Sequence, residues 1–204
     1  EEVGERKEEE DKTTTPKKKK EEEDDECPIC LDEVSLVSEF TRFTCCGKVL
    51  HTHCSADLSS MGKVNNNCPL CRAKTPTSLE EAVKYLRPWL KKKKAWAQNM
   101  MGQMYERGQG VKQSYEMAKM LFEQAAQQGN ASAIFSLGDM YRDGLGVEQS
   151  YERAFEYYEQ PADLGHPLAQ FNLGIMYYNG RGVERVDIAK AREWWTKAAA
   201  QGQK

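Results

Sequence analysis

The sequence has no cysteine before residue 27 or after residue 71, and no apolar run near the roughly 18 residues that cross a membrane. It shows no signal peptide, although a chain that begins at Glu1 leaves upstream targeting open. No catalytic set of serine, histidine and aspartate, of cysteine and histidine, or of paired carboxylates stands out. These absences argue against membrane insertion, a secreted disulfide framework and covalent catalysis. The seven cysteines that are present, which could bind zinc as thiolates, favour a reducing compartment, the cytoplasm or, as the alternative, the nucleus.

Residues 1–26 have almost nothing to bury, since Val3 is their one aliphatic side chain. They hold 13 acidic and 7 basic side chains, and four lysines at residues 17–20 precede an acidic run to Glu26. Segments of this composition do not form a core. We expect a disordered charged tail, with a nuclear localisation signal at the four lysines as the alternative.

All seven cysteines and two of the three histidines fall within residues 27–71. Two Cys-x-x-Cys motifs, which we call hooks, flank a segment rich in cysteine and histidine. The order of candidate ligands along the chain is Cys27, Cys30, Cys45, Cys46, His51, Cys54, Cys68 and Cys71. Hooks of this kind suit tetrahedral zinc. Seven thiolates and one imidazole are enough ligands for two four-coordinate zinc ions, with no cysteine left over. His53 is a reserve ligand.

The order of ligands, the proline after the first cysteine of each hook and the arginine after the last ligand resemble a RING finger. PHD fingers and the RING variant of membrane-bound ligases share the order but usually carry a tryptophan before the last pair, where this chain has three asparagines at residues 65–67. The resemblance implies a small zinc-stabilised α+β cross-brace domain over residues 27–72. It also implies a first zinc on Cys27, Cys30, His51 and Cys54, and a second on Cys45, Cys46, Cys68 and Cys71.

Cys45 and Cys46 are adjacent, which departs from the usual spacing of the second ligand pair and keeps His53 open as an alternative to Cys45. A domain this small buries too little apolar surface to fold alone, so we expect structural zinc to stabilise it. Within it, residues 34–44 predict a loop and a short strand, and residues 52–61 predict one short helix.

RING ubiquitin-protein ligases bind a ubiquitin-conjugating enzyme that carries ubiquitin, and form no covalent intermediate of their own. The resemblance implies that Ile29, Pro69 and Leu70 contact this enzyme and that Arg72 bridges it to ubiquitin. With four protein ligands on each ion, zinc has no open position for catalysis. The alternative is a non-catalytic adaptor in which the zinc module is only a structural or interaction unit.

Residues 73–94 are expected to form a linker with a helix. Ser78 and Glu81 match a capping box, and the helix should run to about Lys94. Pro88 is expected to kink or divide it, and the four lysines at residues 91–94 complement the helix dipole. No recognised nucleic-acid-binding motif accompanies these lysines, so nucleic acid is not an expected partner.

Residues 95–204 repeat with a period of 36 residues, in three units at about 95–130, 131–166 and 167–202. The columns that agree include Gly102, Gly138 and Gly174; Tyr105, Tyr141 and Tyr177; and Gly108, Gly144 and Gly180. Each unit has a stretch with helical spacing, a Gly-x-Gly-Val turn and a second helical stretch rich in alanine and aromatic residues that ends at glycine. This pattern predicts an αα-hairpin.

The pattern at residues 137–147, Leu-Gly-x-Met-Tyr-x-x-Gly-x-Gly-Val, resembles the Sel-one-like (Sel1-like) repeat, a relative of the tetratricopeptide repeat. The resemblance implies an all-α solenoid of helical hairpin repeats whose curved surface binds proteins. We expect a protein substrate or adaptor to contact the positions that vary between first helices, namely Gln103, Asp139, Ile175, Glu106, Arg142 and Tyr178. Pro161 replaces an alanine and is expected to kink its helix, and His166 is expected to be a surface turn residue.

Overall fold

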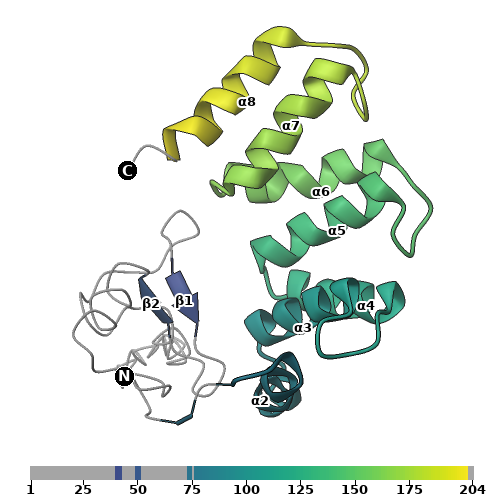
Figure 1. The fold of residues 1–204 in the computed structure, drawn as a ribbon. Coiled ribbons are helices and arrows are strands. Elements are labelled where there is room, and N and C mark those ends of the chain that lie inside the picture. The colour runs from purple at the N-terminus through teal and green to yellow at the C-terminus, as the bar shows by residue number, and fades with distance from the viewer. Residues whose placement is uncertain (1–39, 43–48, 52–72, 75, 202–204) are drawn as a thin grey trace, which may run out of the picture.

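The computed structural model describes residues 40–42, 49–51, 73–74 and 76–201. Their elements are β1 (Phe40–Arg42), β2 (Val49–His51), α2 (Leu79–Lys91), α3 (Ala95–Arg107), α4 (Tyr115–Ala126), α5 (Ala131–Asp143), α6 (Tyr151–Asp163), α7 (Pro167–Asn179) and α8 (Ile188–Gln201). Helices α2 to α8 stack in chain order (Figure 1). Within the described ranges, no helix is long and apolar enough to cross a membrane.

The two strands form an antiparallel pair in which Phe40 lies opposite His51 and Arg42 opposite Val49. β1 falls inside residues 34–44, where the sequence predicts a short strand. The predicted charged tail and the predicted helix at residues 52–61 lie outside the described residues. The described part of the cysteine-rich region is therefore this strand pair, with His51 as the last residue of β2.

Helices α3 to α8 form the three predicted αα-hairpins, α3 with α4, α5 with α6 and α7 with α8. Each first helix ends at a glycine in the left-handed conformation, with φ of 67°, 70° and 66° at Gly108, Gly144 and Gly180. A second glycine in each turn has no side chain and so leaves room for the preceding unit to pack against the turn. A Cβ at Gly146, for example, would lie 2.6 Å from Cβ of Tyr115 in the preceding unit.

Within each hairpin, an aromatic side chain of the second helix packs against a glycine of the first helix. We call these contacts glycine crossings, and they pair Gly102 with Phe122, Gly138 with Tyr158, and Gly174 with Trp195. A Cβ at Gly138 would lie 2.5 Å from the ring of Tyr158, which is fully buried. The predicted small residues are also buried, since Ala118, Ala154 and Ala191 are each 0% exposed.

Helix α2 continues the repeat pattern toward the N-terminus. It begins 36 residues before α4, and three serines in register cap α2, α4 and α6 by accepting a backbone N–H bond, namely Ser78, Ser114 and Ser150. Leu86 is fully buried at the position that Phe122 and Tyr158 occupy in later units. It packs with side chains of α3 and α4 in one cluster. The helix that the sequence analysis places in a linker therefore packs on α3 in register with the second helices of the later units.

The ends of α2 differ from the predicted pattern. Ser78 caps the helix, but the Glu81 carboxylate accepts its bonds from the backbone N–H (2.8 Å) and hydroxyl (3.0 Å) of Thr77 instead of from Ser78. These bonds lower the pKa of Glu81. The helix continues through Pro88 and ends at Lys91, because Lys93 has a φ of 54° that no right-handed helix can hold.

Pro161 also lies inside a helix. It is fully buried in α6, two residues before the helix ends at Asp163, and its carbonyl accepts the backbone N–H of His166 at 2.8 Å. A proline in the last turn removes one helical hydrogen bond, the one that the Tyr157 carbonyl would accept. The helix therefore tolerates the substitution for alanine at its end.

Gly138→Ala is expected to lower the free energy of unfolding by roughly 1–3 kcal/mol, because the added methyl overlaps the buried Tyr158 ring. Gly129→Ala is the matched control, since a Cβ there meets nothing within 4 Å and its cost comes only from a φ of 81°. Urea unfolding followed by tryptophan fluorescence measures both, because all four tryptophans lie in α2, α3 and α8. A smaller loss for Gly138→Ala than for Gly129→Ala would contradict the crossing.

Leu86→Ala is expected to destabilise the solenoid by about 2–5 kcal/mol, because Leu86 is fully buried among residues of α3 and α4. Leu79→Ala tests the same side-chain change in the same helix at a site that is 50% exposed. The same fluorescence measurement compares them. Equal, small effects would mean that α2 is a linker helix outside the core.

Candidate functional site

The first helices carry the variable positions on one face of the solenoid. We define the first-helix face as the positions spaced by three and four residues along α3, α5 and α7: Trp96, Asn99, Gln103 and Glu106; Ser132, Phe135, Asp139 and Arg142; Leu168, Phe171, Ile175 and Tyr178. Contacts between units join this face. Asp139 of α5 bonds to Asn172 of α7, and the ring of Phe135 stacks on His166 at the start of α7.

Asp139 is the centre of a polar network in the middle of the face. Its carboxylate accepts bonds from the Tyr158 hydroxyl (2.6 Å) and the Asn172 amide (3.3 Å), and it pairs with Arg142 (2.8 Å). Burial raises the pKa of Asp139, although the bonds to Tyr158 and Arg142 oppose the shift. Arg142 also forms two bonds to Asp143, at 2.8 and 2.7 Å, which lower the pKa of Asp143. Arg142 is thus engaged by two carboxylates.

Glu106 on α3 lies on the other side of this network. Burial raises the pKa of its carboxyl; Arg107 opposes the shift, and the charges of Asp139 and Asp143 add to it. Among the residues that the structure describes, no side chain donates a hydrogen bond to this carboxylate or forms an ion pair with it. The α3 and α5 part of the face therefore carries an uncompensated negative charge.

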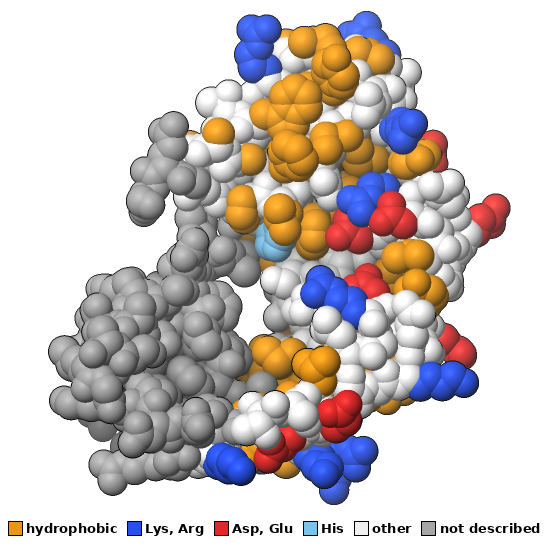
Figure 2. Space-filling model, in the orientation of Figure 1, with side chains coloured by type: hydrophobic (Ala, Val, Ile, Leu, Met, Phe, Trp, Pro, Cys, Tyr) orange, Lys and Arg blue, Asp and Glu red, His pale blue; other side chains and the backbone are white. Residues whose placement is uncertain are grey.

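The α7 part of the face is apolar. Leu168, Phe171 and Tyr178 are 58%, 49% and 53% exposed, and with half-buried Ile175 they form one stripe. The Trp195 side chain reaches the stripe from α8, where its Nε1–H donates to the Phe171 carbonyl at 3.2 Å and its ring lies 5.6 Å from that of Tyr178. Figure 2 shows hydrophobic side chains gathered over the end of the solenoid that holds α7 and α8.

His166 lies in the turn between α6 and α7, as the sequence analysis expects, but it is partly buried and has a structural role there. It caps α7, with Nδ1 accepting the backbone N–H of Ala169 at 3.3 Å, and its ring stacks on Phe135 at 4.7 Å. Burial lowers the pKa of His166. In the preceding unit Asn130 caps α5 in the same way, at 2.9 Å. Histidine is not among the usual capping residues, so capping rules did not identify it.

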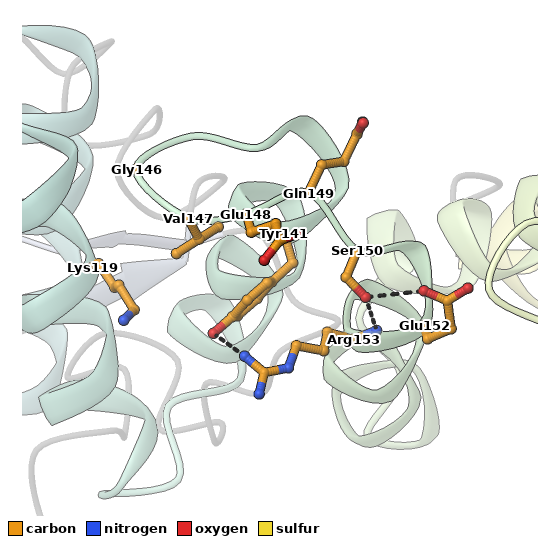
Figure 3. A pocket seen from close by; sticks show the side chains of 9 residues that line it. All are labelled: Lys119, Tyr141, Gly146, Val147, Glu148, Gln149, Ser150, Glu152 and Arg153. Carbon is orange, nitrogen blue, oxygen red and sulfur yellow. Dashed lines mark hydrogen bonds between the residues drawn. The ribbon is translucent and has the colours of Figure 1, made fainter.

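Two equivalent pockets, of 670 and 450 Å³, lie beside the turns of the second and third units. Figure 3 shows the larger one, where Arg153 donates to the Tyr141 hydroxyl at 3.1 Å and Ser150 donates to Glu152 at 3.0 Å. Its lining mixes Lys119 and Arg153 with two carboxylates. Because an equivalent pocket recurs in the next unit, we attribute it to the repeat geometry.

Seven of the eight predicted zinc ligands, and Ile29, Pro69, Leu70 and Arg72, lie outside the described residues. The eighth ligand, His51, ends β2, and Cys45 and Cys46 stand among the six residues between the paired strands. In the described residues, no three His, Cys, Asp or Glu side chains gather as a metal site. The donor set itself, seven thiols and an imidazole, fits tetrahedral zinc.

Glu106→Gln is expected to raise the midpoint of thermal unfolding at about pH 7, because it removes a half-buried charge and keeps the shape. The pKa of Glu106 is higher in the folded than in the unfolded protein. Its cost is therefore fully present above the folded pKa and is lost as the pH falls below the unfolded one.

The gain from Glu106→Gln should thus shrink as the pH falls from about 7 toward about 4.3, the pKa of an unperturbed glutamate, when tryptophan fluorescence follows unfolding. Glu159→Gln, at an exposed site in α6, is the control and should give little change. A destabilised Glu106→Gln variant would show that a partner for the carboxylate exists in the folded chain.

The comparisons with known proteins agree with both resemblances. The Sel1 repeat family matches residues 97–130, 131–166 and 167–203, and the Ring finger domain family matches residues 25–72. No curated protein matches the chain.

Among solved structures, the solenoid is similar to c5321, a protective antigen of uropathogenic Escherichia coli that displays an SLR fold, with 35% identity over 63% of this chain and a TM-score of 0.58. It is also similar to a Sel1 repeat protein from Oxalobacter formigenes, with 27% identity over 74% of this chain and a TM-score of 0.57. The matches span 27% and 53% of those two chains. The chain belongs to the Sel1 repeat family and carries a RING finger ahead of its repeats.

Proposed function

We propose that this protein is a RING-type ubiquitin-protein ligase that recruits a ubiquitin-conjugating enzyme through its zinc module and a substrate or partner through its helical repeats. The observation that carries the proposal is the RING finger at residues 25–72, which contains eight zinc-competent ligands and an arginine directly after the last of them. The repeats supply the second half of the proposal, because stacked hairpins present an extended binding surface.

The zinc ions are structural in this proposal. Cys27, Cys30, His51 and Cys54 would hold one ion, and Cys45, Cys46, Cys68 and Cys71 the other. Zinc with four protein ligands has no open position, so it would shape the recognition surface without polarising a substrate.

The RING surface would act by positioning another enzyme's thioester. A substrate lysine attacks the ubiquitin thioester carbonyl, an isopeptide bond forms, and the conjugating enzyme's cysteine leaves as a thiolate. Ile29, Pro69 and Leu70 would give the apolar contact with that enzyme. Arg72 would bridge the enzyme and ubiquitin, because its planar fork of donors reaches carbonyl oxygens on both at once, as lysine cannot.

The short connection between the modules supports a shared task. Only six residues separate Arg72 from Leu79, the first residue of α2, and α2 is already part of the solenoid. Six extended residues span at most about 20 Å. A partner bound on the repeats would therefore stay near the thioester, which raises its effective concentration there.

Arg72→Ala is expected to slow discharge of ubiquitin from a conjugating enzyme to free lysine by at least about tenfold, which corresponds to 1.4 kcal/mol of transition-state stabilisation. Ile29→Ala should weaken docking and raise the enzyme concentration needed for half-maximal discharge. Lys74→Ala is the matched control, an exposed cation two residues after Arg72. Metal analysis should find two zinc ions per chain in the unmodified protein and in every variant.

Two results would count against the proposal. Full discharge by Arg72→Ala with its zinc intact would reject the bridging role of the arginine. Absence of discharge with a broad panel of conjugating enzymes, from protein that holds two zinc ions, would favour the adaptor role.

A further inference from the structure

The first-helix face changes character from one end of the solenoid to the other. The α7 stripe is apolar and about half exposed, whereas the α3 and α5 part holds the carboxylates of Glu106 and Asp139, with the carboxylate of Asp143 beside the face on α5. Equivalent positions of successive units thus offer different chemistry. The glycine crossings and buried alanines that hold each hairpin together recur in every unit, so the hairpins themselves do not require this change.

We propose that the first-helix face binds an amphipathic α-helix of a partner protein, with apolar side chains on the α7 stripe and lysine or arginine side chains beside Glu106 and Asp143. This inference rests on the proposed role of the repeats in partner binding, and it specifies the chemistry of that partner. It also assigns the stripe and the carboxylates to the two ends of one binding site.

A helix suits the apolar end better than an extended segment does. The stripe from Leu168 to Tyr178 rises about 15 Å along α7, which is close to three helical turns. An extended segment brings backbone N–H and C=O groups that need partners, and the exposed stripe offers apolar side chains. A helix satisfies its own backbone and presents residues at spacings of three and four, which match such a stripe.

The acidic end of the face, which holds Glu106 on α3 and Asp139 on α5, favours a positively charged group of the partner. Arg142 is already bonded to Asp139 and Asp143, and Arg107 only partly offsets the charges around Glu106. The Glu106 carboxylate has no ion-pair partner in the part of the chain that the structure describes. Asp143 keeps 42% of its side chain exposed. A lysine or arginine would meet unpaired negative charge there, and a carboxylate would be repelled.

The two ends of the face lie on different helices, the apolar end on α7 and the acidic end on α3 and α5. The partner should therefore carry its apolar residues in one half and its basic residues in the other.

The chain's own tail does not meet these requirements. Residues 17–20 are four lysines that suit the acidic end, but Val3 is the one aliphatic residue of the tail, so it has no apolar group of side chains for the stripe. A second copy of the chain could cover the stripe with its own stripe. The oligomeric state of the chain in solution distinguishes this occupant from a partner helix.

The test uses the full chain with zinc bound and, as probe, a phage-displayed library of 18-residue peptides on a helical scaffold with randomised surface positions. Enriched peptides are expected to carry leucine, isoleucine, phenylalanine or methionine at spacings of three and four in one half. They should carry at least two lysines or arginines in the other half.

One enriched peptide, synthesised with a fluorophore, should bind at least tenfold more weakly to Phe171→Gln and to Leu168→Gln by fluorescence anisotropy. The double variant Glu106→Lys with Asp143→Lys should lose binding to a similar extent and should select acidic peptides from the same library. The matched controls are Met120→Gln, at a 40% exposed site in α4, and Glu159→Lys in α6, and binding should change less than twofold.

Several outcomes would overturn the inference: no enriched helical peptide, enriched peptides without basic residues, or unchanged binding to Phe171→Gln and Leu168→Gln. A dimer that sedimentation detects and that Phe171→Gln dissociates would assign the face to self-association. Discharge of ubiquitin to free lysine does not need the repeats and should be unchanged in these variants. An inactive parent protein would thus reject the ligase proposal and leave the peptide result standing.

Discussion

The solenoid depends on the glycine crossings, where an aromatic ring of the second helix, fully buried at Phe122 and Tyr158, fills the space that a side chain on the first helix would occupy. The same contact builds the surface. Because Tyr158 passes Gly138, its hydroxyl reaches Asp139, and because Trp195 passes Gly174, its indole N–H reaches the Phe171 carbonyl. Close packing inside a hairpin therefore sets which polar and apolar groups appear on the first-helix face.

The sequence predicted the parts of the fold that depend on residue type alone. Glycines with positive φ and alanines at helix contacts recur every 36 residues, and the three hairpins follow from them. The sequence analysis did not recognise that α2 is in register with the second helices of the repeats, because the sequence before Ser78 lacks the Gly-x-Gly-Val turn. The remaining signals of α2, a capping serine and a buried leucine in register, are recognisable only beside the later units.

The sequence predicted which positions form the candidate surface, but it did not predict which of their charges are left without a partner. The repeat comparison selected Arg142 and Asp139 as variable residues, and in the sequence Arg142 looks like a cation available to a partner. The structure shows it held by Asp139 and Asp143, which leaves Glu106 of the preceding unit as the unpaired charge. Contacts between units decide this balance, and a single repeat does not contain them. The zinc ligands are assigned from their order in the sequence and stay predictions.

At Glu106, the stability of the fold and the requirements of a binding surface favour different side chains. A half-buried carboxylate that faces Asp139 and Asp143 makes the folded chain less stable than a neutral residue of the same shape would. Burial raises the pKa of Glu106, because the half-buried site disfavours the charged form of the carboxyl. Local conflicts of this kind tend to mark functional positions in natural proteins. A cation supplied from outside the chain would resolve the conflict, so the same carboxylate that weakens the free solenoid would strengthen a complex with a basic helix.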